Sequence, residues 1–146
     1  MRNIAMATTY ETDYYQWTIE QGKALRKLVN THQEIKHLGE IDWDNIIEEI
    51  EALGRSEYSA VVSLLRRQIE HLLKIDYVPL EECCRKWKAE VLAFKKNLKG
   101  KYAPGMKPKL EKQFEEIYQD AVEIVQAEYD VDLPEQSPYL LDDLIF

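Results

Sequence analysis

The chain has 146 residues, of which 45% are hydrophobic, 10% aromatic and 32% charged, and its net charge is −8. This length predicts a single domain, residues 1–146, and the aromatic content excludes a disordered chain. No run approaches the roughly 18 apolar residues of a membrane span, and residues 1–7 lack the apolar stretch of a signal peptide. We therefore expect a cytoplasmic protein without a membrane span, whose residues 1–9 form a poorly ordered arm.

The chain has two cysteines, Cys83 and Cys84, which are neighbours. A disulfide between adjacent residues is strained, so we expect reduced thiols. Cys84 falls on an apolar stripe and is expected to act as a small core residue.

Apolar residues recur every three or four positions and no stretch alternates with a period of two. The pattern predicts an all-α fold, a compact bundle of about five helices plus a short C-terminal helix. The first helix is expected to begin near Thr12 or Asp13, which can cap it, and to end near Asn30. Its inward face is expected to hold Tyr14, Trp17, Gln21, Leu25 and Leu28.

Asp42 predicts the start of a second helix, and Gly54 its stop or a kink. Ser56 is then expected to cap a third helix that ends near Tyr77, before Pro79. The inward stripe of the second helix is Trp43, Ile46, Ile47, Ile50 and Leu53. The third helix carries two apolar stripes, which predicts a central position in the bundle. One stripe is Tyr58, Val61, Val62, Leu65, Ile69, Leu72 and Leu73, and the other is Leu64, Gln68, His71 and Ile75.

Two more long helices are predicted over residues 80–98 and 109–129, joined by a loop at 100–108 that holds two Gly and two Pro. Ser137 and Pro138 are expected to start a last short helix, 139–144, that docks on the bundle. The inward residues of the helix at 80–98 are expected to be Cys84, Trp87, Val91, Phe94 and Leu98. Those of the helix at 109–129 are expected to be Leu110, Phe114, Ile117, Ala121, Ile124 and Val125.

Four strings of the sequence look familiar: YETDYYQWT at 10–18, DWDNIIEEIEALGRSE at 42–57, EHLLK at 70–74 and SPY at 137–139. In this order and spacing they resemble Domain of Unknown Function family 29, a bacterial family of small all-helical proteins. The resemblance implies an α-helical single domain, with no established activity, substrate or catalytic residue. One departure is Gln136 with Ser137, where the family pattern would have a Cys before Pro138.

Motifs of common chemistries are missing from the sequence. It contains no glycine-rich phosphate loop, no Cys-x-x-Cys, no His-Glu-x-x-His and no Gly-x-Ser-x-Gly. Nucleotide hydrolysis, structural zinc and serine-hydrolase chemistry are therefore disfavoured, and no cofactor and no catalytic residue is predicted.

The best candidates for a polar site are Glu48, Glu51, Arg55 and His71. One hypothesis is a metal or acid–base site built from Glu48, Glu51 and His71, although the Glu-x-x-His pair of di-metal bundles is missing. The alternative is a solvated acidic face together with an interior His71. A buried imidazole needs partners for its ring nitrogens, and a carboxylate or a Tyr hydroxyl is expected to supply one.

Arg55 has two predicted structural roles. It lies four residues after Glu51, a favourable spacing for an ion pair if the helix continues through Gly54. Alternatively, Arg55 and Glu57 would fix the angle between the second and third helices.

The charge is divided along the chain. Residues 1–80 have a net charge of −4, residues 81–112 of +6 and residues 113–146 of −10. The basic-patch candidates are Arg85, Lys88, Lys95 and Lys99. Such a patch is either solvated or faces the acidic C-terminal segment, within the chain or across a homodimer. Its other predicted partners are an acidic protein and nucleic acid, although a charge of −8 repels polyanions at long range.

The missing catalytic motifs and the divided charge predict a non-enzymatic protein-interaction or regulatory module, antitoxin-like or an adaptor. Its partner would be a protein, either a second copy or another chain. The alternatives are a metal-binding bundle with a carboxylate/His site and a weak nucleic-acid binder that uses the basic helix.

Overall fold

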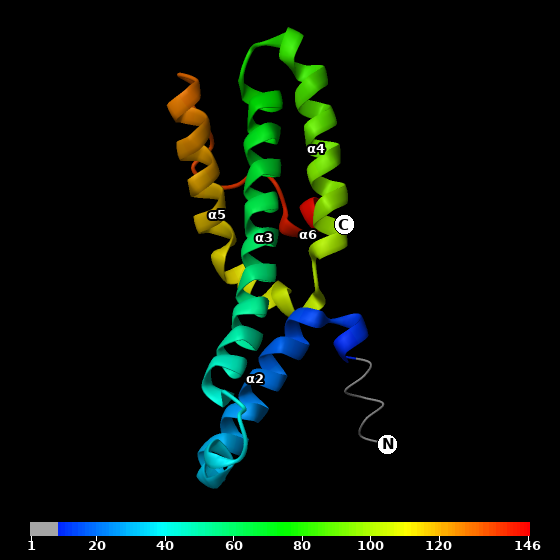
Figure 1. Ribbon diagram of the computed structural model, residues 1–146. Coiled ribbons are helices and arrows are strands. Elements are labelled where there is room, and N and C mark those ends of the chain that lie inside the picture. Colours follow the sequence, from blue (N-terminus) through cyan, green and yellow to red (C-terminus); the bar gives the residue numbers. More distant parts are fainter. Residues whose placement is uncertain (1–8) are drawn as a thin grey trace. The chain divides into compact units, whose positions relative to one another are not determined.

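The computed structural model describes residues 9–146, so the arm predicted for residues 1–9 lies, apart from Thr9, outside the described residues (Figure 1). The described residues contain helices and no strand, which confirms the all-α fold. The long helices are α2 (Tyr14–Thr31), α3 (Trp43–Tyr77), α4 (Glu81–Lys101) and α5 (Lys107–Glu128). The shorter ones are α6 (Leu141–Ile145) and the 3₁₀ turns η1 (Gln33–His37) and η2 (Pro104–Met106).

The chain divides into two compact units. Unit 1 contains the described residues up to Tyr58 together with Ala103–Met106, and unit 2 contains Ser59–Tyr102 and Lys107–Phe146. Helix α3 is continuous and contributes its first half to unit 1 and its second half to unit 2.

Helix α3 passes through Gly54, where a stop or kink was predicted, and Ser56 is not a cap. That prediction is wrong because Gly54 has a packing role. A Cβ at this position would lie 2.3 Å from Oγ1 of Thr18, so only glycine allows α2 to come this close. Glycine lowers helix stability by about 1 kcal/mol relative to alanine, and the packing offsets that cost.

In unit 1, α2 and the first half of α3 pack side by side through small residues (Figure 1). Asp13 caps α2 as expected, since its Oδ1 accepts from the backbone N–H of Gln16 at 2.9 Å. The predicted inward face of α2 is wrong by one position. The buried residues are Tyr15, Thr18, Gly22 and Val29.

The first half of α3 differs from prediction in part. It buries Ile47 and Tyr58, as predicted, together with Gly54, whereas Ile46 and Leu53 remain 43% and 46% exposed. Gly22 and Gly54 explain this choice of face. A Cβ on Gly22 would lie 2.8 Å from Cγ of Glu51, so the helices meet where side chains are smallest. Ile46 and Leu53 are therefore left at the sides of the contact.

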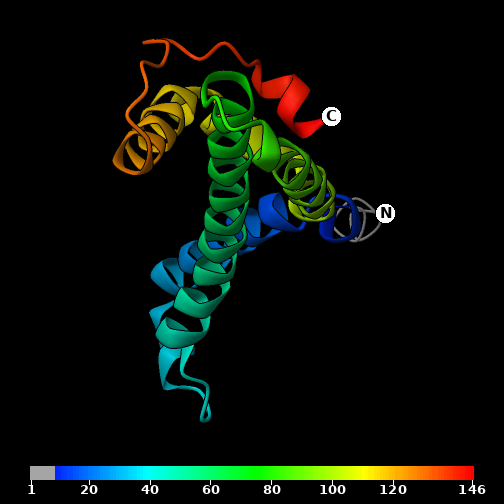
Figure 2. The same ribbon diagram turned by 90° about the horizontal axis from the view of Figure 1, so that it is seen from above.

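In unit 2, the core is close to the predicted one. The second half of α3 has α4 on one side and α5 on the other (Figures 1 and 2). The buried residues that were predicted include Val61, Leu65, Ile69, Leu73, Trp87, Leu98, Leu110, Ile117, Ala121 and Val125. One prediction on α5 is wrong, because Ile124 is 39% exposed while Tyr118 and Val122 are buried instead.

The connection between α4 and α5 is shorter than predicted. Helix α4 continues through Gly100 to Lys101, and α5 begins at Lys107 directly after η2. The backbone N–H of Gly105 in η2 donates to Oδ2 of Asp13 at 2.6 Å. The cap of α2 therefore also fixes this connection within unit 1.

The C-terminal segment docks on unit 2 as expected, and Leu141, Leu144 and Ile145 are buried. The cap predicted at Ser137 and Pro138 is wrong, because α6 begins later, at Leu141. Oγ of Ser137 instead accepts from the backbone N–H of Tyr139 and donates to its carbonyl oxygen. Both hydrogen bonds of the Ser137 hydroxyl go to backbone groups of Tyr139, so they form a local turn, and α6 begins only after it.

Candidate functional site

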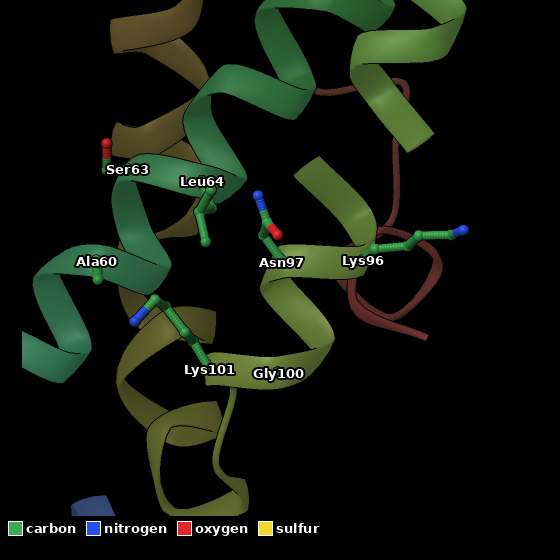
Figure 3. A pocket seen from close by; sticks show the side chains of 7 residues that line it. All are labelled: Ala60, Ser63, Leu64, Lys96, Asn97, Gly100 and Lys101. Carbon is green, nitrogen blue, oxygen red and sulfur yellow. The ribbon is translucent and has the colours of Figure 1, made fainter. Parts of the chain in front are cut away.

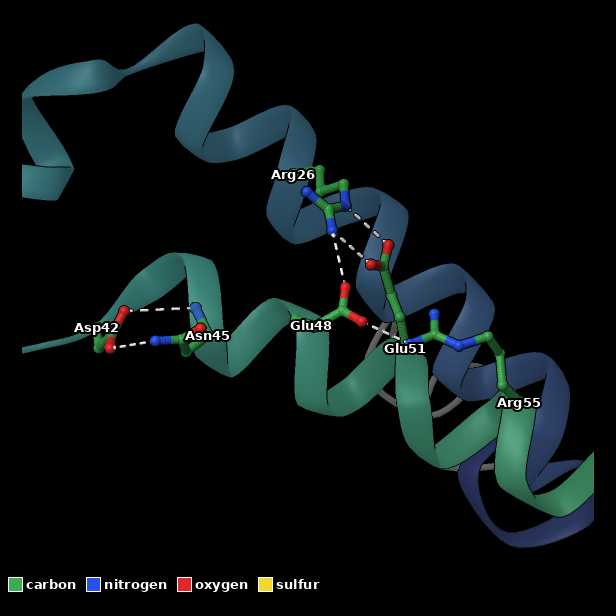
Figure 4. Close-up of polar contacts among 6 residues, drawn as sticks. All are labelled: Arg26, Asp42, Asn45, Glu48, Glu51 and Arg55. Carbon is green, nitrogen blue, oxygen red and sulfur yellow. Dashed lines mark hydrogen bonds and ion pairs between the residues drawn. The ribbon is translucent and has the colours of Figure 1, made fainter.

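The conspicuous polar cluster of unit 1 contains two arginines and two glutamates (Figure 4). Nε and Nη2 of Arg26 on α2 donate to the two carboxylate oxygens of Glu51 at 2.8 and 2.5 Å. Glu48 lies 3.6 Å from Arg26 and accepts from Nη2 of Arg55 at 2.5 Å. The cluster therefore ties α2 to α3 by charge-assisted hydrogen bonds.

These contacts lower the pKa of Glu51, chiefly through the hydrogen bond from Arg26. Burial opposes this shift, and the charges of Arg26 and Arg55 lower the pKa further. The same hydrogen bond raises the pKa of Arg26. Arg55 pairs with Glu48, seven residues earlier, and not with Glu51 as predicted. Its other predicted role, setting an angle with Glu57 between two helices, is wrong because α3 is one helix.

His71 of unit 2 has the carboxylate partner that was predicted for it. Its Nε2 contacts the carboxylate of Glu90 on α4, and its Nδ1 lies 2.9 Å from the backbone carbonyl of Arg67. The ring packs edge-on against Phe94, with centroids 5.1 Å apart. The side chain of His71 is 14% exposed and that of Glu90 34% exposed, so this pair joins α3 and α4 at the edge of their contact.

The structure does not bring His71 together with Glu48 and Glu51. The two glutamates belong to unit 1 and bond to arginines, while His71 belongs to unit 2 and bonds to Glu90. Among residues 9–146, no group of three His, Cys, Asp or Glu side chains is placed to hold a metal ion. The shared carboxylate/His site is therefore not formed by these three residues.

Two further contacts in unit 2 anchor the acidic C-terminal region. Lys74, 8% exposed, pairs with Glu128 at 3.0 Å and lies 5.9 Å from the rings of Trp87 and Tyr129. The hydroxyl of Tyr139 donates to Asp76 at 2.7 Å. Burial, and then this bond to the carboxylate, raise the pKa of Tyr139. Both contacts are structural.

The basic segment, residues 81–112, meets the acidic C-terminal segment at two points, one on α4 and one at the start of α5. Nζ of Lys95 donates to the backbone carbonyl of Asp143 at 3.2 Å, and Lys107 pairs with Asp142 at 3.2 Å. This pairing also raises the pKa of Lys107. Of the four predicted patch residues, Lys95 is thus the one that the acidic segment contacts.

The rest of the patch forms a row on the exposed side of α4. Its residues, spaced three or four apart, are Arg85, Lys88, Leu92, Lys96 and Lys99, which we call the outer basic face. None of its four cations has an ion pair within residues 9–146. Leu92, in the middle of the row, is 55% exposed. The row therefore combines free positive charge with an exposed apolar side chain.

An open groove of about 610 Å³ lies between α3 and α4, beside the outer basic face (Figure 3). Figure 3 shows Asn97 and Lys101 directed toward α3, while Lys96 points away from it. The lining residues include no carboxylate: Ala60, Ser63, Leu64, Lys96, Asn97, Gly100 and Lys101. The groove can accept an anionic group with hydrogen-bond acceptors.

The sequence matches one known family over almost its whole length. The profile described as "Domain of unknown function DUF29" covers residues 9–146. The chain belongs to this family. A solved structure of similar fold is an alpha-helical protein of unknown function from Rhodospirillum rubrum, with 28% identity and a TM-score of 0.82. The match covers 94% of this chain and 89% of that one. No curated protein matches the chain.

The strings that suggested the DUF29 family have identifiable structural roles. Asp13, Gly54 and His71 each make a contact that holds two segments together. Sequence reasoning missed distant partners, such as Arg26 for Glu51 and Glu90 for His71, because no local pattern shows which charged residues will face each other. Glycine inside a helical pattern was the one available signal, since such a glycine often marks close packing.

No helix within residues 9–146 is both long and apolar enough to cross a membrane.

Proposed function

We propose that this DUF29 protein is a non-enzymatic protein-interaction module that binds an acidic protein surface through the outer basic face of α4. The observation that carries the proposal is the composition of that face. Four cations without an ion pair in the described chain surround the exposed Leu92. An adaptor or an antitoxin-like regulator would use such a surface in the bacterial cytoplasm, and the two free cysteines agree with a reducing compartment.

The outer basic face is suited to a protein because it is both charged and apolar. Charged residues around an interface speed association and select partners, whereas buried apolar side chains supply most of the affinity. The neighbouring groove extends the contact, since Asn97 and Lys101 can hydrogen-bond a carboxylate that enters it.

Nucleic acid is the weaker candidate for the same face. Leu92 takes the central place that a phosphate-binding surface would give to another cation, and the net charge of −8 opposes the approach of a polyanion. For a nucleic-acid complex, the logarithm of the binding constant would fall linearly with the logarithm of the salt concentration. The slope is set by the number of phosphates that the protein contacts.

The test is affinity capture with the full chain and two matched variants. Lys88→Glu with Lys99→Glu reverses the outer basic face. Lys23→Glu with Lys112→Glu makes the same change in net charge at exposed positions outside that face. Each protein is immobilised in native lysate, and any captured protein is then purified and titrated at two salt concentrations.

The proposal predicts an acidic partner that binds the wild type and the control variant, and whose affinity falls at least about tenfold with the face variant. Equal binding by all three proteins would place the interaction elsewhere on the molecule. Capture of nucleic acid by the wild type and not by the face variant would replace the proposal with the alternative.

A further inference from the structure

One apolar stripe follows α3 along both of its halves. Within each half its members recur every three or four residues: Ile46, Ile50 and Leu53 in the first half, and, starting eleven positions after Leu53, Leu64, Gln68, His71 and Ile75 in the second. In unit 2 the stripe is covered by α4, as the pairing of His71 with Glu90 and the 2% exposure of Gln68 show. In unit 1 α2 packs on another face of α3, and Ile46 and Leu53 stay 43% and 46% exposed.

The exposed half of the stripe lies beside acidic residues. Glu49 is exposed next to Ile50, and Glu57 follows Leu53 by one turn on the same side of the helix. Neither glutamate has an ion pair within residues 9–146, in contrast to Glu48 and Glu51. We call Ile46, Glu49, Ile50, Leu53 and Glu57 the acidic apolar face.

This face has the chemistry opposite to that of the outer basic face of α4. One has unpaired carboxylates around exposed Ile46 and Leu53, and the other has unpaired cations around exposed Leu92. Both are rows on a single helix with residues three or four apart, so two such helices can pack side chains from one row between those of the other. The α3–α4 contact in unit 2 shows that this chain already pairs helices along the same stripe.

We infer that the acidic apolar face is the docking site for the outer basic face of a second copy of this chain. The inference rests on the proposed function, because it names the acidic surface that α4 binds. Because one chain carries both faces, the outer basic face of one copy can meet the acidic apolar face of another copy. The opposite charges of the two faces would favour association over the separate chains.

Self-association is measured by sedimentation velocity of the full chain at low and moderate salt, over a range of concentrations. Three variants accompany the wild type. Lys88→Glu with Lys99→Glu reverses the basic face, and Glu49→Lys with Glu57→Lys reverses the acidic face. Lys23→Glu with Lys112→Glu, at two exposed positions outside both faces, is the control. Circular dichroism confirms that each variant melts as the wild type does.

The wild type and the control are expected to dimerise, more strongly at low salt. Each face variant alone should raise the dissociation constant at least about tenfold. Mixing the two face variants in equal amounts should restore dimers, because each reversed face then meets the oppositely reversed face of the other variant. Recovery by mixing distinguishes docking from a general loss of stability, which mixing cannot repair.

A wild type that stays monomeric at about 100 μM and low salt overturns the inference, since contacts of this kind reach micromolar affinity or better. Dimers that survive in both face variants overturn it as well, as does failure of the mixture to associate. The proposed function stands independently if a monomeric wild type still captures a different acidic protein through the outer basic face.

Discussion

The two units of this protein are built from similar helices but pack by different means. Unit 2 buries large aliphatic and aromatic side chains, such as Leu65, Ile69 and Tyr118, at or near zero exposure. Unit 1 instead brings α2 and α3 together through Thr18, Gly22 and Gly54, and closes one side of the contact with ion pairs.

The difference shows that an apolar stripe does not have to face the core of its own chain. Close approach at small residues increases the number of favourable contacts between helix backbones and fixes which faces meet. In unit 1 this leaves Ile46 and Leu53 partly exposed, although their spacing is that of core residues. Partly exposed apolar rows with unpaired charges are what an interaction surface requires.

The largest expected effect comes from truncating the core of unit 2. Leu65→Ala should lower the free energy of unfolding by about 2–5 kcal/mol, since Leu65 is 0% exposed and truncation leaves a cavity. Leu53→Ala in unit 1 is the matched control and should cost less than about 1 kcal/mol. Urea denaturation of both variants measures the contrast. Equal losses would mean that Leu53 is as much a core residue as Leu65.

A methyl group added between the helices of unit 1 should destabilise the protein. Gly54→Ala is expected to lower the free energy of unfolding by about 1–3 kcal/mol, even though alanine is the better helix former. Thr18 cannot easily move away, because its hydroxyl is buried and donates to the carbonyl of Tyr15 at 2.7 Å. The melting temperature reports the change.

Gly100→Ala is the control for that substitution. Nothing lies within 4 Å of a Cβ at Gly100, which also lies in a helix. The free energy of unfolding of the Gly100→Ala variant should stay the same or rise by up to about 1 kcal/mol. If Gly54→Ala were as stable as Gly100→Ala, packing through small residues would not hold unit 1 together.

The polar contact between α3 and α4 should contribute less. His71→Leu is expected to lower the free energy of unfolding by about 1–2 kcal/mol, because the half-buried Glu90 loses the imidazole and keeps only the more distant Lys86 at 4.0 Å. His37→Leu, at an exposed position, is the control. Thermal denaturation that is unchanged by His71→Leu would contradict an interior role for the imidazole.

The smallest effect is a pH dependence from the ion-pair cluster of unit 1. The bond from Arg26 holds the pKa of Glu51 below its usual value of 4.5. Glu51 therefore stabilises the fold above that value, and this contribution is lost as the pH falls through the lower pKa of the folded state. Between about pH 5 and pH 3, the wild type should lose more stability than Glu51→Gln. Parallel losses in urea midpoints would show that the cluster is only a surface contact.

The sequence predicted unit 2 well because its buried faces are continuous and apolar. Val61, Leu65, Ile69 and Leu73 recur with helical spacing, so the strongest stripe is also the buried one. The partner of His71 could be predicted as a kind of group, a carboxylate, from the needs of a buried imidazole. That it is Glu90 depends on which turn of α4 lies opposite, and no local pattern specifies this.

The sequence predicted unit 1 less well because two signals conflict there. The more apolar face of α2 is formed by Tyr14, Trp17, Leu25 and Leu28. The face that contacts α3 lies one position further along the chain and includes the small residues Thr18 and Gly22. Gly54 was interpreted as the end of a helix because glycine is a weak helix former. Its actual role is visible only when Thr18 is placed against it.

The sequence by itself determined the all-α class, the start of α2, the core of unit 2 and the division of charge into acidic and basic segments. These features depend on residues near each other in the chain, through helical periodicity, capping and composition. The tertiary structure alone decided that α3 is one helix, that Arg26 and Glu90 complete the polar contacts, and that Ile46, Leu53 and Leu92 remain exposed. Those outcomes depend on which faces of distant helices fit together, and side-chain size and charge decide that only once the helices are in contact.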